Sequence, residues 1–152
     1  MAKVAIVVGS KTDLPSMANC RKYLEHFGIE YEEMVMSAHR NPEKTAEFAR
    51  QARERGFAVI IAAAGMAAHL AGTIAAHTIL PVIGVPMPGS HLNGLDALLS
   101  TVQMPTGIPV ATTAIGSAGA ANAAILAAQI LALHDESISE KLVTFKQQGA
   151  RL

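Results

Sequence analysis

Two short segments of this chain combine side chains that can transfer a proton with side chains that can bind an anion. Residues 9–13 read Gly-Ser-Lys-Thr-Asp, and residues 37–42 read Ser-Ala-His-Arg-Asn-Pro. Histidine both donates and accepts a proton near neutral pH, and arginine offers a forked donor for phosphate or carboxylate. Together the two segments indicate acid/base chemistry on a small phosphorylated substrate.

The first segment, residues 9–13, matches neither of the two common phosphate-binding loops. It lacks the Gly-Lys-Ser/Thr of a Walker loop and the Gly-x-Gly-x-x-Gly of a dinucleotide-binding turn. What remains is a turn between a strand and a helix, where free amides can bind a phosphate and Ser10 and Thr12 add hydroxyl donors. Without the second segment, Asp13 or Thr12 would be interpreted as the N-cap of that helix rather than as a ligand-binding residue.

His39 and Arg40 are the stronger candidates, because they lie between a strand end and a helix capped by Asn41. An isolated His-Arg pair is more often a solvated loop, so the expected approach to residues 9–13 is what favours function. His69 follows another expected strand end and can face the same cleft. The remaining histidines are expected at surface, interface or core positions: His26, His77, His91 and His134.

The elements that must bring these residues together alternate between strand and helix. Apolar, β-branched runs predict strands at residues 4–8, 57–62, 82–85 and 109–113. Residues 30–36 predict a second strand that is more polar at its start and therefore nearer an edge of the sheet. Helical spacing with Gly, Pro and capping residues predicts helices between Asp13 and Gly28, between Asn41 and Gly56, and over residues 65–78, 92–102, 118–133 and 138–147.

This order of elements predicts one α/β domain over residues 1–152, a flavodoxin-like three-layer sandwich. Right-handed crossovers give a five-stranded parallel sheet in the order 2-1-3-4-5, with a final helix at the C-terminus. In that order the ends of the first three strands are close together. Ser10, Asp13, His39, Arg40 and Gly65 can then share one cleft.

The composition excludes several other classes of protein. A net charge of zero and an aromatic content of 4% do not suit nucleic-acid binding. Cys20, the only cysteine, cannot form a disulfide or a thiolate zinc site within the chain, and it reads as a buried helix residue. No apolar run is typical of a signal peptide or a membrane span, so we expect a cytoplasmic protein without a membrane partner.

Half of the chain is nearly uncharged. Between Gly56 and Leu133, Asp96 is the only Asp, Glu, Lys or Arg, whereas about a quarter of the residues of a typical domain are charged. One small domain cannot cover so much uncharged surface. We therefore expect a homo-oligomer with large apolar interfaces; a weakly soluble monomer is the alternative.

Seven motifs occur in order over about residues 4–133. They are Gly9-Ser10-x-x-Asp13, Ser37-Ala38-His39-Arg40-x-Pro42, Ala67-Ala68-His69-Leu70, Leu80-Pro81-Val82-x-Gly84-Val85-Pro86, Gly94-x-Asp96-x-Leu98, Val102-Gln103-Met104-Pro105-x-Gly107-Ile108-Pro109-Val110 and Ala120-Ala121-Asn122-Ala123-Ala124. In this combination the chain resembles the class I phosphoribosylaminoimidazole carboxylase catalytic subunits, the 5-(carboxyamino)imidazole ribonucleotide mutases of purine biosynthesis.

The resemblance implies an isomerase that moves a carboxylate from the exocyclic N5 of an imidazole ribonucleotide to C4 of its ring. The substrate loses CO2 to give aminoimidazole ribonucleotide, which is then recarboxylated without a metal or an organic cofactor. His39 matches the family's catalytic general acid/base. Ser10 and Arg40 match positions that bind the phosphate region, and Asp13 matches the position that binds the ribose hydroxyls.

Further expectations concern the surroundings of those four residues. A second tier of the site is expected at Thr12, Ser37, Gly65 and His69. The resemblance also implies a homo-octamer, and residues 103–107 are a candidate lid. Where the family usually has Gly and Pro, this chain has Met66 and Ala71, which bears on the shape of the CO2 pocket.

Two other functions stay open at this level. One is a direct carboxylase, which joins CO2 to aminoimidazole ribonucleotide without using the carboxyamino substrate. The other is a nucleotide-binding or assembly protein with no catalytic activity, for which the uncharged half of the chain would be the interaction surface.

Overall fold

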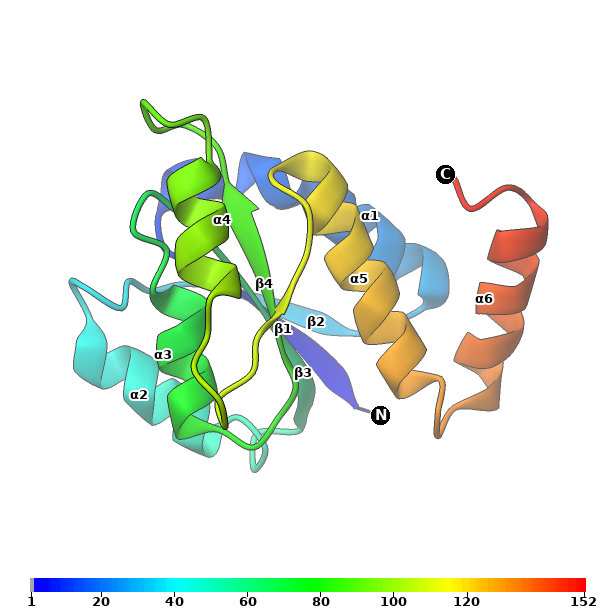
Figure 1. The fold of residues 1–152 in the computed structure, drawn as a ribbon. Coiled ribbons are helices and arrows are strands. Elements are labelled where there is room, and N and C mark those ends of the chain that lie inside the picture. Colours follow the sequence, from blue (N-terminus) through cyan, green and yellow to red (C-terminus); the bar gives the residue numbers. More distant parts are fainter. Residues whose placement is uncertain (1) are drawn as a thin grey trace.

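A five-stranded parallel sheet lies between two layers of helices in the computed structural model, which describes residues 2–152 (Figure 1). The strand order β2-β1-β3-β4-β5 confirms the flavodoxin-like order predicted from the sequence. The polar second strand forms one edge of the sheet, also as expected. The strands are β1 (Lys3–Val8), β2 (Tyr31–Val35), β3 (Phe57–Gly65), β4 (Val82–Met87) and β5 (Ala111–Thr112).

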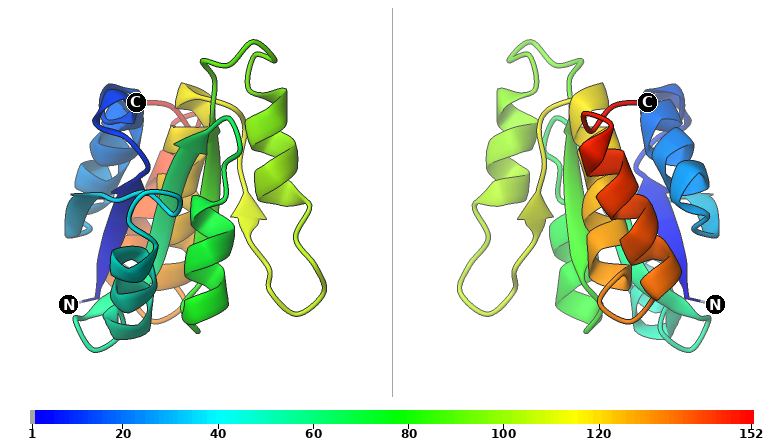
Figure 2. Two further views of the ribbon diagram at one scale, coloured as in Figure 1. Left: turned by 90° about the vertical axis from the view of Figure 1, so that its left-hand side faces the viewer. Right: turned by 90° about the vertical axis from the view of Figure 1, so that its right-hand side faces the viewer.

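Helices cover both faces of this sheet (Figure 2). On one face lie α1 (Ala18–Phe27) and α5 (Ser117–Leu131), with α6 (Glu136–Gln147) packed outside them. On the other face lie α2 (Pro42–Gln51), α3 (Leu70–His77) and α4 (Leu95–Val102). None of the helices in the described part of the chain is long and apolar enough to cross a bilayer.

The interior strand β1 shows why the sheet is buried on both sides. Successive strand side chains point to opposite faces, so Val4, Ile6 and Val8 enter the core beneath α1 and α5. Ala5 and Val7 enter the second core, beneath α2 and α3. All five are fully buried, as expected for an uninterrupted apolar strand in a parallel sheet.

Several predicted element boundaries are wrong around the third and fourth strands. β3 extends to Gly65 and α3 begins only at Leu70, whereas a helix was expected from residue 65. The reason is pairing, since Ala64 and Gly65 stay in register with Pro86 and Met87 of β4. Pro86 is tolerated there because β5 pairs only with the start of β4.

The helix starts also differ from expectation. Ser10, not Thr12 or Asp13, caps the first turn, a 3-10 turn η1 (Lys11–Asp13); a second 3-10 turn, η2 (Pro15–Met17), then leads into α1. Asn41 occupies the cap position of α2 without capping it through its side chain. The later predicted boundaries shift by a few residues, and the strand expected at residues 109–113 shortens to β5.

Candidate active site

A cavity of about 750 Å³ opens at the carboxyl ends of β1, β2 and β3. This is the edge at which parallel α/β sheets bind their ligands. All eight residues that the sequence indicated for the site line it: Ser10, Thr12, Asp13, Ser37, His39, Arg40, Gly65 and His69.

The two histidines of the cavity are in direct contact. Nε2 of His39, in the turn after β2, lies 2.7 Å from Nδ1 of His69, just before α3. The ring centroids are 4.9 Å apart and the planes are inclined by 76°. One ring donates a hydrogen bond to the other, so a proton can pass between two residues that are thirty positions apart in the sequence.

The turn that carries His39 and Arg40 is held by the side chains on either side of it. Ser37 Oγ accepts hydrogen bonds from the backbone N–H of His39 at 3.3 Å and of Arg40 at 3.2 Å. Asn41 Oδ1 accepts one from Ser37 N at 3.3 Å. Ser and Asn favour such turns because their short side chains reach nearby backbone groups. Ser37 therefore shapes the turn.

The loop after β1 places hydroxyls and a carboxylate at the cavity. Ser10 Oγ accepts from Thr12 N at 3.3 Å and lies 2.9 Å from Thr12 Oγ1. Asp13 is half-buried, and burial raises the pKa of its carboxyl group. This carboxylate is suited to accept hydrogen bonds from a ligand.

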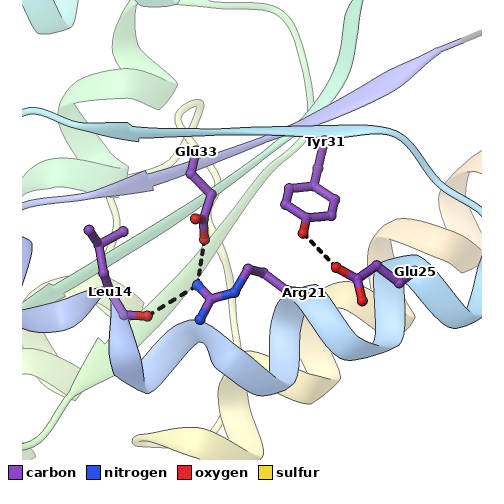
Figure 3. A network of polar contacts seen from close by, with 5 residues as sticks. All are labelled: Leu14, Arg21, Glu25, Tyr31 and Glu33. Atoms are coloured by element: carbon purple, nitrogen blue, oxygen red, sulfur yellow. Dashed lines mark hydrogen bonds and ion pairs between the residues drawn. The ribbon is translucent and has the colours of Figure 1, made fainter.

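Arg21 of α1 fixes the far end of that loop (Figure 3). Its Nη1 donates to the Leu14 carbonyl at 3.2 Å and to Glu33 Oε1 of β2 at 2.6 Å. Leu14 directly follows Asp13, so this contact ties the first loop of the site to the second strand. Nearby, Tyr31 donates to Glu25 at 2.7 Å, and this hydrogen bond is the main reason that the pKa of Tyr31 rises to about 12.

The segment after β3 has small side chains and one unusual backbone conformation. Met66 has a φ of +55°, in the left-handed region that bulky residues rarely adopt, and 65% of the residue is exposed. Glycine is therefore not required at this position, although the conformation favours it. Met66 lines the cavity together with Ala67 and Gly65.

The sequence analysis missed part of the lining, and the candidate lid is not part of that lining. Pro88 and Gly89, which follow β4, line the cavity without having been singled out. Their position after a strand end was the signal that could have identified them. Residues 103–107 follow α4, which runs back along the sheet (Figure 1), and Met104 packs against Gly72 of α3 without lining the cavity. These residues do not line the cavity of the single chain, and the lid stays a prediction.

The cavity is open to solvent in the single chain, although CO2 released in it would have to be retained. His39, Arg40 and His69 are all exposed. Closure therefore requires the substrate, a movement of the chain or a second copy. Within residues 2–152, no three His, Cys, Asp or Glu side chains are grouped so that they could hold a metal ion.

Cys20 lies outside the site, buried in α1. Burial, reinforced by the charge of Glu33, raises its pKa to about 12. A thiol that stays protonated is a poor nucleophile. The prediction of a buried helix residue is confirmed.

Comparisons with known proteins agree with this architecture and with the resemblance seen in the sequence. A family model described as AIR carboxylase matches residues 3–151. The N5-carboxyaminoimidazole ribonucleotide mutase of Vibrio parahaemolyticus is 57% identical over 146 residues, covering 96% of this chain and 91% of that protein. The protein of the same name from Pyrococcus abyssi is 55% identical over 151 residues, covering 99% and 86%.

Among solved structures, Treponema denticola PurE has the same fold, with a TM-score of 0.88 at 28% identity. The match covers 99% of this chain and 92% of that one. The family model spans nearly the whole chain, and the two relatives, each more than half identical over the match, are covered over 91% and 86% of their own length. The chain belongs to the AIR carboxylase family.

Proposed function

We propose that this chain is an N5-carboxyaminoimidazole ribonucleotide mutase, an isomerase of purine biosynthesis that works in the cytoplasm. The observation that carries the proposal is the contact of His39 with His69 inside a cavity that also presents Arg40 and the Asp13 carboxylate. The cavity, at about 750 Å³, lies within the range of small-molecule sites. The names of the relatives support the same activity.

Binding is assigned to three residues that line the cavity. Arg40 is exposed beside the helix start of α2 and offers a forked, permanently charged donor for phosphate. Ser10 adds a hydroxyl at the first turn, where free backbone amides also favour an anion. The Asp13 carboxylate, being an acceptor only, suits the ribose hydroxyls.

Catalysis is assigned to His39. When the C–N bond of the carboxyamino group breaks, CO2 leaves and the electron pair stays on N5, which takes a proton from the imidazole. C4 of the resulting aminoimidazole then attacks CO2 and forms the new C–C bond. The C4 hydrogen leaves as a proton to the same imidazole and the ring becomes aromatic again, so that the proton is returned and no co-reactant is consumed.

Assembly is part of the proposal. Leu95, Leu99 and Val102 lie along one side of α4 and are each between 44% and 51% exposed, and Leu92 just before the helix is 60% exposed. Such a stripe is typical of an interface core rather than of a monomer surface. It supports a homo-oligomer, the octamer implied by the sequence resemblance, in which copies of the chain cover this face.

The test is a transfer assay with the substrate's carboxylate labelled with ¹³C and unlabelled bicarbonate in solution. A mutase yields the C4-carboxylate with the label retained, because the CO2 never leaves the site. Product that carries unlabelled carbon, and that also forms from aminoimidazole ribonucleotide plus bicarbonate alone, would instead identify a direct carboxylase. No product in either arm would leave only nucleotide binding, and the proposal would be wrong.

A further inference from the structure

The loop of residues 66–69 is held by a side chain from a distant element, Ser100 in α4. The Ser100 hydroxyl oxygen accepts a hydrogen bond from Ala68 N at 3.0 Å. The same hydroxyl donates to the Asp96 carbonyl, one turn earlier in α4, at 2.6 Å. The carbonyl oxygen of Met66 lies 3.4 Å away from it. Ser100 thus joins the helix to both ends of the turn that precedes His69.

The Ser100 oxygen is the acceptor for the backbone N–H of Ala68, a group that is buried away from water. Ala68 is 2% exposed, and a buried N–H without an acceptor is strongly unfavourable. The turn also contains Met66 in the left-handed region, a conformation that persists only when its surroundings enforce it. Without the Ser100 oxygen, we expect the backbone of residues 66–69 to move to a conformation in which the Ala68 N–H finds another acceptor.

His69 directly follows Ala68, so relaxation there moves the imidazole. The separation of 2.7 Å between His69 Nδ1 and His39 Nε2 tolerates little displacement, since hydrogen bonds weaken steeply with distance and angle. The nitrogen of His39 that bears the proton is fixed by what the other nitrogen contacts. The conformation of residues 66–69 therefore affects which nitrogen of His39 carries the proton.

We propose that Ser100 is a positioning residue for the imidazole pair. It fixes the backbone at Ala68, which places His69 Nδ1 against His39 Nε2 and thereby selects the tautomer of His39. The expected effect of Ser100 on turnover rests on the proposed function. Its effect on the placement of the two imidazole rings does not. Ser100 itself is not among the residues that line the cavity.

Ser100→Ala tests this, with Thr101→Val as the matched control. Thr101 is the next residue of α4, and its hydroxyl donates only within the helix, to Ala97 O at 2.7 Å. For Ser100→Ala we expect changed imidazole ¹⁵N chemical shifts for both His39 and His69, a kcat lower by about tenfold with KM nearly unchanged, and a shifted pH profile of kcat. Ser100→Thr, which keeps the hydroxyl, restores all three, and Thr101→Val changes none.

A folded Ser100→Ala protein with the parent's imidazole shifts and the parent's pH profile would overturn the proposal. If the alanine variant does not fold, Ser100→Cys replaces it, because a thiol fills the space but accepts hydrogen bonds poorly. The imidazole ¹⁵N chemical shifts and the pH profile of kcat are then measured on the cysteine variant, and parent-like values overturn the proposal. The imidazole spectra need no turnover. If the proposed function is wrong, the parent is inactive while the spectra still respond to Ser100→Ala.

Discussion

Nε2 of His39 and Nδ1 of His69 face each other at 2.7 Å, and the two rings meet edge to face. Two imidazolium rings would bring two N–H groups together at this contact, so at least one of the two nitrogens carries no proton. The arrangement thus gives His39 a partner that can hold a proton or supply one. A general acid/base that must first give a proton and then take it back benefits from such a partner.

Replacing the proposed general acid/base gives the first prediction. His39→Asn should abolish turnover, because an amide cannot carry the transferred proton, while nucleotide affinity stays close to that of the parent. Turnover is measured with the carboxyamino substrate, and affinity by calorimetry with aminoimidazole ribonucleotide. His134→Asn changes an exposed histidine that lies near Glu30 and Ala58, at the starts of β2 and β3, and serves as the control. An active His39→Asn variant would contradict the assignment.

Arg40 provides the second prediction, because it is assigned to the phosphate. Arg40→Ala should weaken nucleotide binding by about 1.5–3 kcal/mol, the usual range for a hydrogen bond to a charged group. Arg40→Lys should recover part of the loss, since it keeps the charge without the forked geometry. Arg50→Ala, an exposed arginine near the end of α2, is the control. Unchanged affinity in Arg40→Ala would exclude the phosphate role.

Much of the fold was predictable because its strongest signals are local. The run of residues 4–8 contains only apolar side chains, and a strand of this kind has to lie in the middle of a sheet. The alternation of strands and helices then restricts the topology to a few possibilities. With β1 between β2 and β3, the loops after β1 and β2 had to lie side by side, and so it could be predicted that Asp13 and His39 share one cavity.

Residues 63–69 were the hardest to predict from the sequence, and the reason is physical. Alanine and glycine have no side chain that would distinguish a strand from a helix, and alanine has the highest helix propensity of all residues. Pairing of Ala64 with Pro86 kept the segment in the sheet. Its exit is then shaped by the hydrogen bond between Ala68 and Ser100, residues whose separation along the chain leaves no local pattern.

The His39–His69 contact depends on that exit, which explains why the sequence indicated both residues but not their pairing. The position of residues 103–107 was hard to predict for a similar reason. That position follows from the direction in which α4 runs along the sheet (Figure 1), and none of residues 103–107 lines the cavity of the single chain.

The third prediction concerns pH and Asp13. Burial raises the pKa of this carboxyl above the ordinary value of 3.8, so the folded chain binds a proton more readily than the unfolded chain. This difference in pKa contributes to the free energy of unfolding. The contribution is fully present below pH 3.8 and is lost as the pH rises through the raised pKa. Asp13→Asn removes this dependence, and its free energy of unfolding relative to the parent should increase from acidic to neutral pH.

The expected gain is small, about 0.5 kcal/mol or less, since the Asp13 side chain is only half-buried. Urea unfolding of parent and variant at the two pH values measures it, and Glu54→Gln, an exposed carboxylate in the turn after α2, is the control. Nucleotide affinity should fall in the same Asp13→Asn variant. A relative stability that decreases toward neutral pH would mean that the carboxylate is stabilised by the fold.

The last prediction concerns the apolar stripe on α4. Leu99 is 50% exposed in the single chain, and we expect other copies of the chain to cover it. Leu99→Asp would then bury a charge without a partner, which strongly opposes association, so sedimentation velocity should show a large assembly for the parent and smaller species for the variant. Val143→Asp, which alters a residue of α6 that is 53% exposed, should leave the assembly intact.

The open cavity gives this experiment a second readout. If a neighbouring copy provides the closure that the single chain lacks, dissociated Leu99→Asp should bind nucleotide but release more CO2 per turnover. A parent that sediments as a monomer would show instead that the uncharged half of the chain is stable in contact with water.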